Sequence, residues 1–88
     1  MAYFAQINEE SVVTEVIAVN NATIDYLPYP ESEPVGQEFI TSLGLTGLWL
    51  QTSYNNNFRG TFASIGYTYD ETDDVFVPLP SVEPIDPV

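Results

Sequence analysis

The positions of the prolines divide this chain of 88 residues into segments that can form regular structure and segments that cannot. Three of the seven prolines lie within residues 20–36, and the other four lie within residues 78–88. Each proline removes a backbone N–H and restricts the residue before it, so neither segment can be one long helix or strand. Helices and strands are therefore expected before and between these segments, in a single domain that spans residues 1–77.

A β-hairpin is predicted at the start of the chain, where residues 2–7 and 12–19 are rich in aromatic and β-branched side chains. The intervening sequence NEES has the composition of a turn. Along the second run both faces are mostly apolar, which indicates a central strand that is covered on both sides. One face carries Val13, Glu15, Ile17 and Val19, and the other carries Val12, Thr14, Val16 and Ala18.

One short helix is predicted in the segment GQEFITSLGL, in which Phe39, Ile40 and Leu43 recur at helical spacing. Gly44 is a suitable C-terminal stop for it. We expect this helix to pack on the sheet, with Trp49 filling the core beneath it.

The second half of the chain is predicted to contain a strand at residues 48–53, a turn at residues 54–60 and a second hairpin. The turn sequence YNNNFRG is rich in Asn and Gly, which tolerate the left-handed backbone that tight turns require. The hairpin pairs TFASIGYTYD with DVFVPLP around an acidic tip. The predicted fold class is α+β: a small antiparallel β-sheet built from two hairpins and a further strand, with one short helix and an extended Pro-rich C-terminal arm.

The arm comprises residues 78–88 and is expected to have polyproline character. A stiff extended backbone loses little entropy when it docks, so the arm is predicted to lie across a neighbouring subunit. A frayed C-terminus is the alternative interpretation. The apolar contacts of the arm would be Leu79, Val82, Ile85 and Val88.

Charge restricts the possible partners. Thirteen acidic side chains face a single basic one, Arg59, and the net charge is −12. DNA, RNA and anionic lipid would repel such a chain, so nucleic acids and membranes are disfavoured as partners. Salt weakens the self-repulsion, which suggests a salty working environment, although solubility explains the charge equally well. No signal peptide is recognisable, and no apolar run approaches the roughly 20 residues of a membrane helix.

The residue types that most often carry catalysis are missing. The chain has no His and no Cys, and its one basic residue is an arginine, so the usual general bases and thiolates do not occur. The segment GLTG lacks the lysine and the spacing of a phosphate-binding loop. We therefore expect neither an enzyme nor a cofactor.

Two groups of residues are candidate sites. The first is the acidic tip, which is a weak candidate for cation binding and is better explained as a solvated turn; its members are Asp70, Glu71, Asp73 and Asp74. The second is Arg59, for which an intrachain ion pair or stacking on Phe58 or Tyr54 competes with a role as an anchor between subunits.

Three segments carry a resemblance to a known group: YFAQINEESVVTEVIAV, LWLQTSYNNNFRG and ASIGYTYDETDDVFVP. They resemble small proteins of marine bacteriophages, including phages of cyanobacteria, which carry YFAQ followed by VV, then WxQTSYNxNxR and GIGYTYD. The matching positions are Tyr3 to Gln6, Val12, Val13, Trp49, Gln51 to Asn55, Asn57, Arg59 and Ile65 to Asp70. For a small, acidic, non-enzymatic chain the resemblance implies a phage origin and a place in the virion.

The leading hypothesis is a capsid decoration or cement protein that binds the outer surface of the shell. Its expected partners are coat or tail subunits, and we expect it to form a homo-oligomer on the virion. The alternative is a tail-fibre or tail-tip accessory that uses exposed Tyr and Asn side chains in host attachment. An inhibitor that mimics DNA is disfavoured, because the carboxylates are scattered along the chain.

Overall fold

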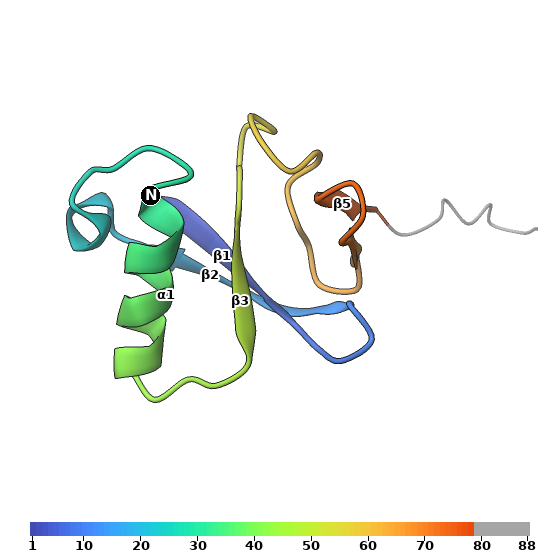
Figure 1. The fold of residues 1–88 in the computed structure, drawn as a ribbon, viewed down its shortest axis with the longest axis horizontal. Coiled ribbons are helices and arrows are strands. Elements are labelled where there is room, and N and C mark those ends of the chain that lie inside the picture. Colours follow the sequence, from blue (N-terminus) through green and yellow to red (C-terminus); the bar gives the residue numbers. More distant parts are fainter. Residues whose placement is uncertain (79–88) are drawn as a thin grey trace, which may run out of the picture.

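The computed structural model describes residues 1–78 and contains two small antiparallel sheets and one α-helix (Figure 1). The first sheet has the strand order β2–β1–β3, with bounds β1 Ala2–Ile7, β2 Val13–Val19 and β3 Leu48–Thr52. Between β2 and β3 lie the 3-10 helix η1 (Asn21–Ile24) and α1 (Ser32–Ser42). The second sheet pairs β4 (Thr68–Asp70) with β5 (Val75–Val77). The α+β class is confirmed, but the second hairpin forms a sheet of its own.

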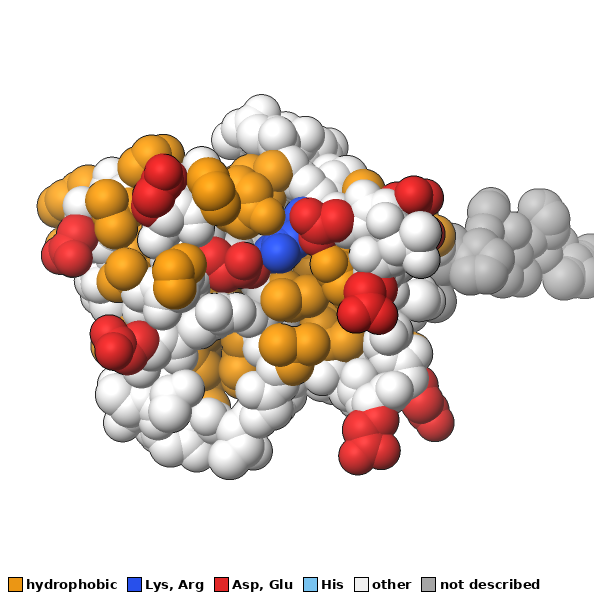
Figure 2. Space-filling view, viewed as in Figure 1, with side chains coloured by type: hydrophobic (Ala, Val, Ile, Leu, Met, Phe, Trp, Pro, Cys, Tyr) orange, Lys and Arg blue, Asp and Glu red, His pale blue; other side chains and the backbone are white. Residues whose placement is uncertain are grey.

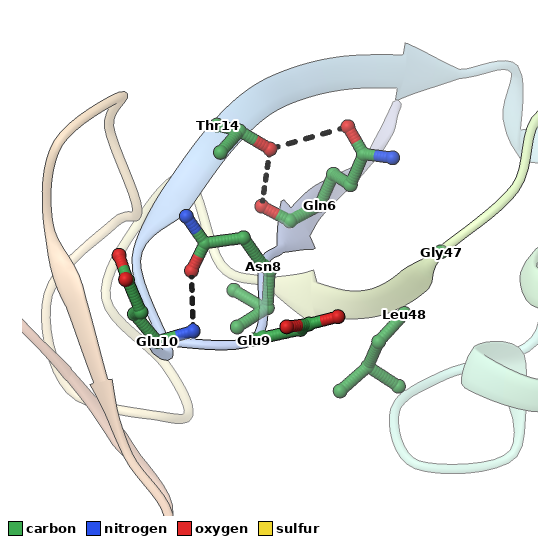
Figure 3. Close-up of a pocket in the computed structure, with 8 residues that line it drawn as sticks. Gln6, Asn8, Glu9, Glu10, Thr14, Gly47 and Leu48 are labelled. Carbon is green, nitrogen blue, oxygen red and sulfur yellow. Dashed lines mark hydrogen bonds between the residues drawn. The ribbon is translucent and has the colours of Figure 1, made fainter.

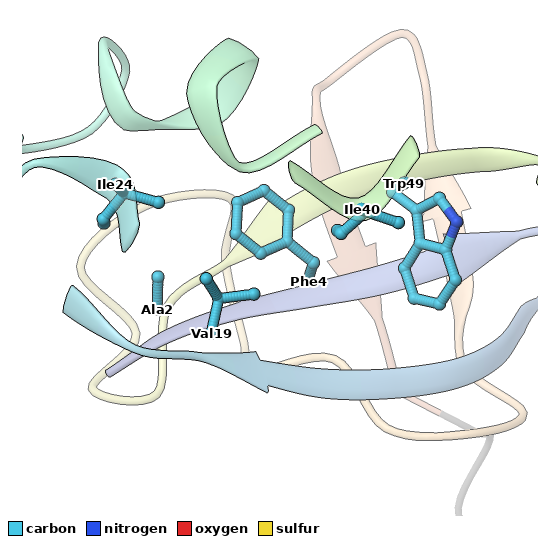
Figure 4. Packing of buried hydrophobic residues seen from close by; sticks show 6 residues of the cluster. All are labelled: Ala2, Phe4, Val19, Ile24, Ile40 and Trp49. Carbon is cyan, nitrogen blue, oxygen red and sulfur yellow. The ribbon is translucent and has the colours of Figure 1, made fainter. Parts of the chain in front are cut away.

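Both faces of the three-stranded sheet are covered. Side chains alternate between the faces of a strand, so in β1 Phe4 points to one side and Ala5 to the other, and both are fully buried. The helix covers one cluster, shown in Figure 4: Ala2, Phe4, Val19, Ile24, Ile40 and Trp49. The predicted position of Trp49 beneath the helix is confirmed. The second hairpin and the chain before it cover the other cluster: Ala5, Ile7, Val13, Leu50, Ala63 and Phe76.

The central strand is β1, and the prediction that residues 12–19 form the central strand is wrong. β3 pairs with β1 on the side opposite β2, which leaves β2 at the edge. The apolar character of β2 has a different cause, because its two ends contribute to the two different clusters. Val13 belongs to the cluster under the second hairpin, and Val19 belongs to the cluster under the helix.

A β-bulge explains how one strand can serve both clusters. Gln6 is opposite Glu15, but Ile7 is opposite Val13, so Thr14 is an extra residue in the ladder. An extra residue reverses the side-chain alternation on either side of it. Val13 therefore lies on the face opposite Ile17, and its predicted assignment to the same face is wrong.

The helix begins at Ser32, earlier than the sequence pattern predicts. Pro34 is its third residue, and in the first turn no backbone N–H has an intrahelical acceptor, so proline is tolerated there. Gly44 follows the helix with φ +87°, which confirms the predicted stop. Leu43, expected to pack on the sheet, is instead 56% exposed. Among the described residues no helix is long and apolar enough to span a membrane.

One glycine is needed within the helix because the sheet approaches it closely. A Cβ atom on Gly36 would lie 2.0 Å from Cζ of Phe4, the fully buried ring at the centre of the cluster. Because glycine has no side chain, the Phe4 ring can pack directly against the helix at this position. The stabilisation from this packing outweighs the lower helix propensity of glycine.

The chain after β3 is mostly turn and loop. Asn56, Arg59 and Gly60 have positive φ, as the predicted turn requires, although an arginine there is unusual. The second hairpin is shorter than predicted, since its strands have three residues each. The N–H and C=O groups of Val13 bond to the backbone of Tyr67 and Gly66, both at 2.8 Å, so the start of β2 joins the second hairpin to the first sheet.

Candidate interaction site

Arg59, the only basic residue of the chain, lies inside a network formed by three distant segments. Its guanidinium forms hydrogen bonds with the Glu33 carboxylate of α1, and its Nε donates to Oδ1 of Asp74 at 2.8 Å. A further bond of 3.0 Å runs from Nη1 to the carbonyl oxygen of Gln51. In Figure 2 the one blue side chain lies between two red carboxylates. The arginine side chain is only 9% exposed, so its charge is satisfied within the chain.

Two tyrosine rings lie close to the guanidinium. Cζ of Arg59 is 5.4 Å from the ring centre of Tyr29 and 5.9 Å from that of Tyr69, distances at which a cation is attracted to an aromatic face. Phe58 stacks on Tyr29 with 3.8 Å between ring centres. The rings near Arg59 are thus those of Tyr29 and Tyr69, whereas the prediction named Phe58 or Tyr54. The alternative prediction of an intrachain ion pair matches the structure.

The network shifts the pKa values of its members. Burial disfavours the charge of Arg59, but hydrogen bonds to Glu33 and Asp74 outweigh it and raise the pKa of the guanidinium. Burial, followed by the hydrogen bond to Asp74, raises the pKa of Tyr69 to about 12. That bond from Tyr69, with help from Arg59, holds the pKa of Asp74 below its ordinary value despite some burial.

The same network closes the outer edge of β3. The Gln51 N–H donates to Glu33 at 2.8 Å, and the Gln51 carbonyl accepts from Arg59, so a carboxylate–guanidinium pair takes the place of a neighbouring strand. The amide of Gln37 donates to the Trp49 carbonyl further along this edge. The buried hydroxyl of Ser32 donates to Oε1 of Gln51 at 2.7 Å. Closing an edge in this way prevents another chain from adding to it.

The four carboxylates of the acidic tip have different surroundings. Oδ1 of Asp70 accepts the N–H groups of Thr72 and Asp73, at 3.0 and 3.2 Å, and so shapes the turn. Asp74 points back to Arg59, whereas Glu71 and Asp73 are exposed. Within residues 1–78 no three metal-ligating side chains of the His, Cys, Asp and Glu types converge. The structure thus assigns the four carboxylates to different tasks.

An exposed apolar loop joins α1 to β3, and the sequence reasoning did not single it out. Every residue from 41 to 48 is exposed, including Leu43, Leu45 and Leu48. The available signal was three leucines interspersed with Gly and Thr around the helix stop, one before Gly44 and two after it. Figure 3 shows Leu48 beside an open cleft whose opposite wall is the turn with Glu9 and Glu10. A second cleft beyond Gln6 is lined by Glu15, Ile17, Leu45 and Trp49, among others.

Three aromatic rings form a separate cluster at the other end of β1. Tyr54 stacks on Tyr3 with 5.5 Å between ring centres, and Phe62 meets both rings edge to face. Tyr54 is 64% exposed, so one aromatic surface of the cluster faces solvent. Residues Asn55 to Asn57 follow directly.

The predicted contacts of the arm, Leu79, Val82, Ile85 and Val88, lie outside the described residues. Comparisons of the chain with protein-family models, with curated proteins and with solved structures found no match.

Proposed function

We propose that the protein is a non-catalytic structural component of a phage virion, and specifically a decoration or cement protein on the outer surface of the capsid. The observation that carries the proposal is the distribution of charge. Of the eleven carboxylate side chains within residues 1–78, only Glu33 and Asp74 reach a cation, and that cation is buried. The remaining acidic surface is interrupted by the exposed leucines of residues 41–48.

The mechanism is adhesion. Apolar side chains such as Leu43, Leu45 and Leu48 are buried against coat subunits, while the carboxylates stay in solvent and keep the particle surface soluble. When the copies are joined in an oligomer, their weak contacts add up to strong attachment, because each bound copy holds the copies linked to it at high local concentration. We also propose that the Pro-rich arm lies across a neighbouring subunit and that copies of the protein form a homo-oligomer on the shell.

Copy number tests the location. A quantitative gel of purified particles should give a copy number comparable with that of the coat protein. A copy number that is a small fraction of this value would assign the protein to the tail. Complete absence from purified particles would refute both virion locations.

The tail-fibre or tail-tip alternative has its own supporting observation, the exposed ring of Tyr54 beside three asparagines. Aromatic rings flanked by amide groups suit the stacking and hydrogen bonding of a sugar. Replacing Tyr54 with Ala should then reduce binding to host cells and leave capsid stability unchanged. For a decoration protein the same change should leave host binding unchanged.

A further inference from the structure

We propose that the outer edge of β2, at Val16 and Ala18, binds an extended basic segment of a partner protein as an added β-strand. This inference deepens the proposed function by naming how a partner is held, and it rests on that function only for the identity of the partner. Its support is the direction of the backbone groups, the apolar side chains beside them and the sign of the surrounding charge.

The alternation of backbone groups shows which residues of β2 face outward. In an antiparallel sheet the N–H and C=O groups of successive residues point to opposite neighbours. Gln51 directs both groups away from β1, which fixes the alternation across the sheet. It follows that Ile17 faces β1, whereas Val16 and Ala18 face outward. The pairs that transmit this alternation are Leu50 with Ala5 and Phe4 with Ile17.

Within residues 1–78 the outward edge of β2 is occupied only at its start. Val13 bonds to the chain at residues 66 and 67, at 2.8 Å in both directions, and Ser11 accepts the Tyr69 N–H. Beyond the bulge no backbone partner of Val16 or Ala18 occurs within the described part of the chain. A strand added there would find up to four free backbone groups, and it would continue the ladder that the second hairpin begins.

Apolar side chains flank this edge on both faces of the sheet. Ile17 is half-buried on the helix side, while Val16 is half-buried and Ala18 exposed on the other. The cleft on the helix side reaches the edge strand, since Glu15 and Ile17 form part of its wall. An added strand could therefore place an apolar side chain against these residues and a basic one beside Glu15.

Charge identifies the kind of partner. Edge strands are commonly guarded by lysine, and this chain has none, while its one arginine is committed to the opposite edge. The strand carries Glu15, and Glu9 and Glu10 lie in the turn before it. Pairing with a second copy would bring two chains of charge −12 together, whereas a basic segment is attracted. The occupant is therefore a basic extended segment of another protein.

The test uses the purified full chain and a synthetic peptide of alternating Lys and Val. Addition of the peptide should shift the amide NMR signals of Val16 and Ala18 most strongly, and the apparent affinity should fall as salt is added. A matched peptide with the same charge is N-methylated at alternate residues, so it lacks the N–H groups that would donate to the β2 edge. It should bind at least about tenfold more weakly, which is the loss expected when strand hydrogen bonds are missing. Glu15→Gln should weaken binding of the unmodified peptide.

Three results would overturn the inference. Equal binding of both peptides would mean that charge alone attracts them, and shifts centred on residues 41–48 would place the partner at the leucine loop. Concentration-dependent dimerisation that Ala18→Pro abolishes would assign the edge to a second copy. Absence of the protein from virions would refute the proposed function and leave the peptide result intact, so the two failures are distinguishable.

Discussion

The two edges of the first sheet are built in opposite ways. At the β3 edge the backbone of Gln51 is bonded to Glu33 and Arg59, and Gln37 covers the next outward carbonyl. At the β2 edge Val16 and Ala18 have no such partners among the described residues. A chain with one basic residue can form only one carboxylate–guanidinium cap. The contrast therefore separates a closed edge, which connects α1 and the second hairpin to β3, from an edge that no described residue covers beyond its start.

The closed edge also connects parts of the chain that are distant in sequence. Arg59 contacts α1 through Glu33, β3 through Gln51 and the second hairpin through Asp74. Its own carbonyl accepts the N–H of Phe76 at 2.9 Å. Loss of this residue should therefore loosen both sheets as well as the edge.

Arg59→Met should have the largest effect, because it removes the cation and leaves Glu33 as an uncompensated charge whose side chain is 15% exposed. Breaking a buried pair by removing one partner costs about 3–5 kcal/mol. The free energy of unfolding, from urea titration monitored by tryptophan fluorescence, measures the loss.

The matched control is the double variant in which Glu33→Leu accompanies Arg59→Met. Since the mostly buried Glu33 charge is then absent and only the exposed Asp74 loses its ion-pair partner, it should recover a substantial part of the lost stability. If Arg59→Met lowers the free energy of unfolding by less than about 1 kcal/mol, which is the range of an exposed ion pair, the network does not stabilise the β3 edge.

Hydrogen exchange compares the edges directly. The Gln51 amide should exchange about ten- to a hundredfold more slowly than the Ala18 amide, after correction for intrinsic rates, because a hydrogen bond to a charged group contributes about 1.5–3 kcal/mol. Similar protection of the two amides would show that the β2 edge is covered in the full chain. Arg59→Met should reduce the difference in exchange rate between the Gln51 and Ala18 amides.

Alkaline pH should weaken the closed edge. The pKa of Tyr69 is raised from 10.0 to about 12, so the folded protein holds this proton more tightly than the unfolded chain does. The stabilisation is complete below pH 10 and is lost as the pH rises through about 12. Urea titrations between pH 9 and pH 12 should show a loss of stability that is smaller in Tyr69→Phe. Parallel curves for the two proteins would contradict the role of this hydroxyl.

Asp74→Asn should have the smallest effect. The Asp74 side chain is 54% exposed, and exposed ion pairs contribute about 0–1 kcal/mol. Asparagine tolerates the left-handed backbone at this position, where φ is 55°, so the turn itself should persist. A loss comparable with that of Arg59→Met would mean that the second hairpin, and not α1, is the main support of the edge.

Local sequence patterns predicted where the helix and strands lie better than they predicted which strands pair with one another. Runs of aromatic and β-branched residues located β1, β2 and β3, and Gly44 located the end of the helix. The sheet order was not predictable in this way, because it depends on which side of β1 receives β3. Nothing local to Glu33 indicates that it pairs with a residue 26 positions away. The early start of α1 was missed because Pro34 breaks helices everywhere except in their first turn.

The bulge at Thr14 has a consequence for changes in chain length. In a regular strand, deletion of one residue moves every side chain beyond it to the other face. Here Thr14 is the surplus residue, and Val13 and Val16 already pack on the same side of the sheet. Its deletion would convert the bulge into regular pairing with Val13 and Val16 still on that side. Thr14 is thus a position within the sheet at which homologous chains can differ by one residue and keep the same core.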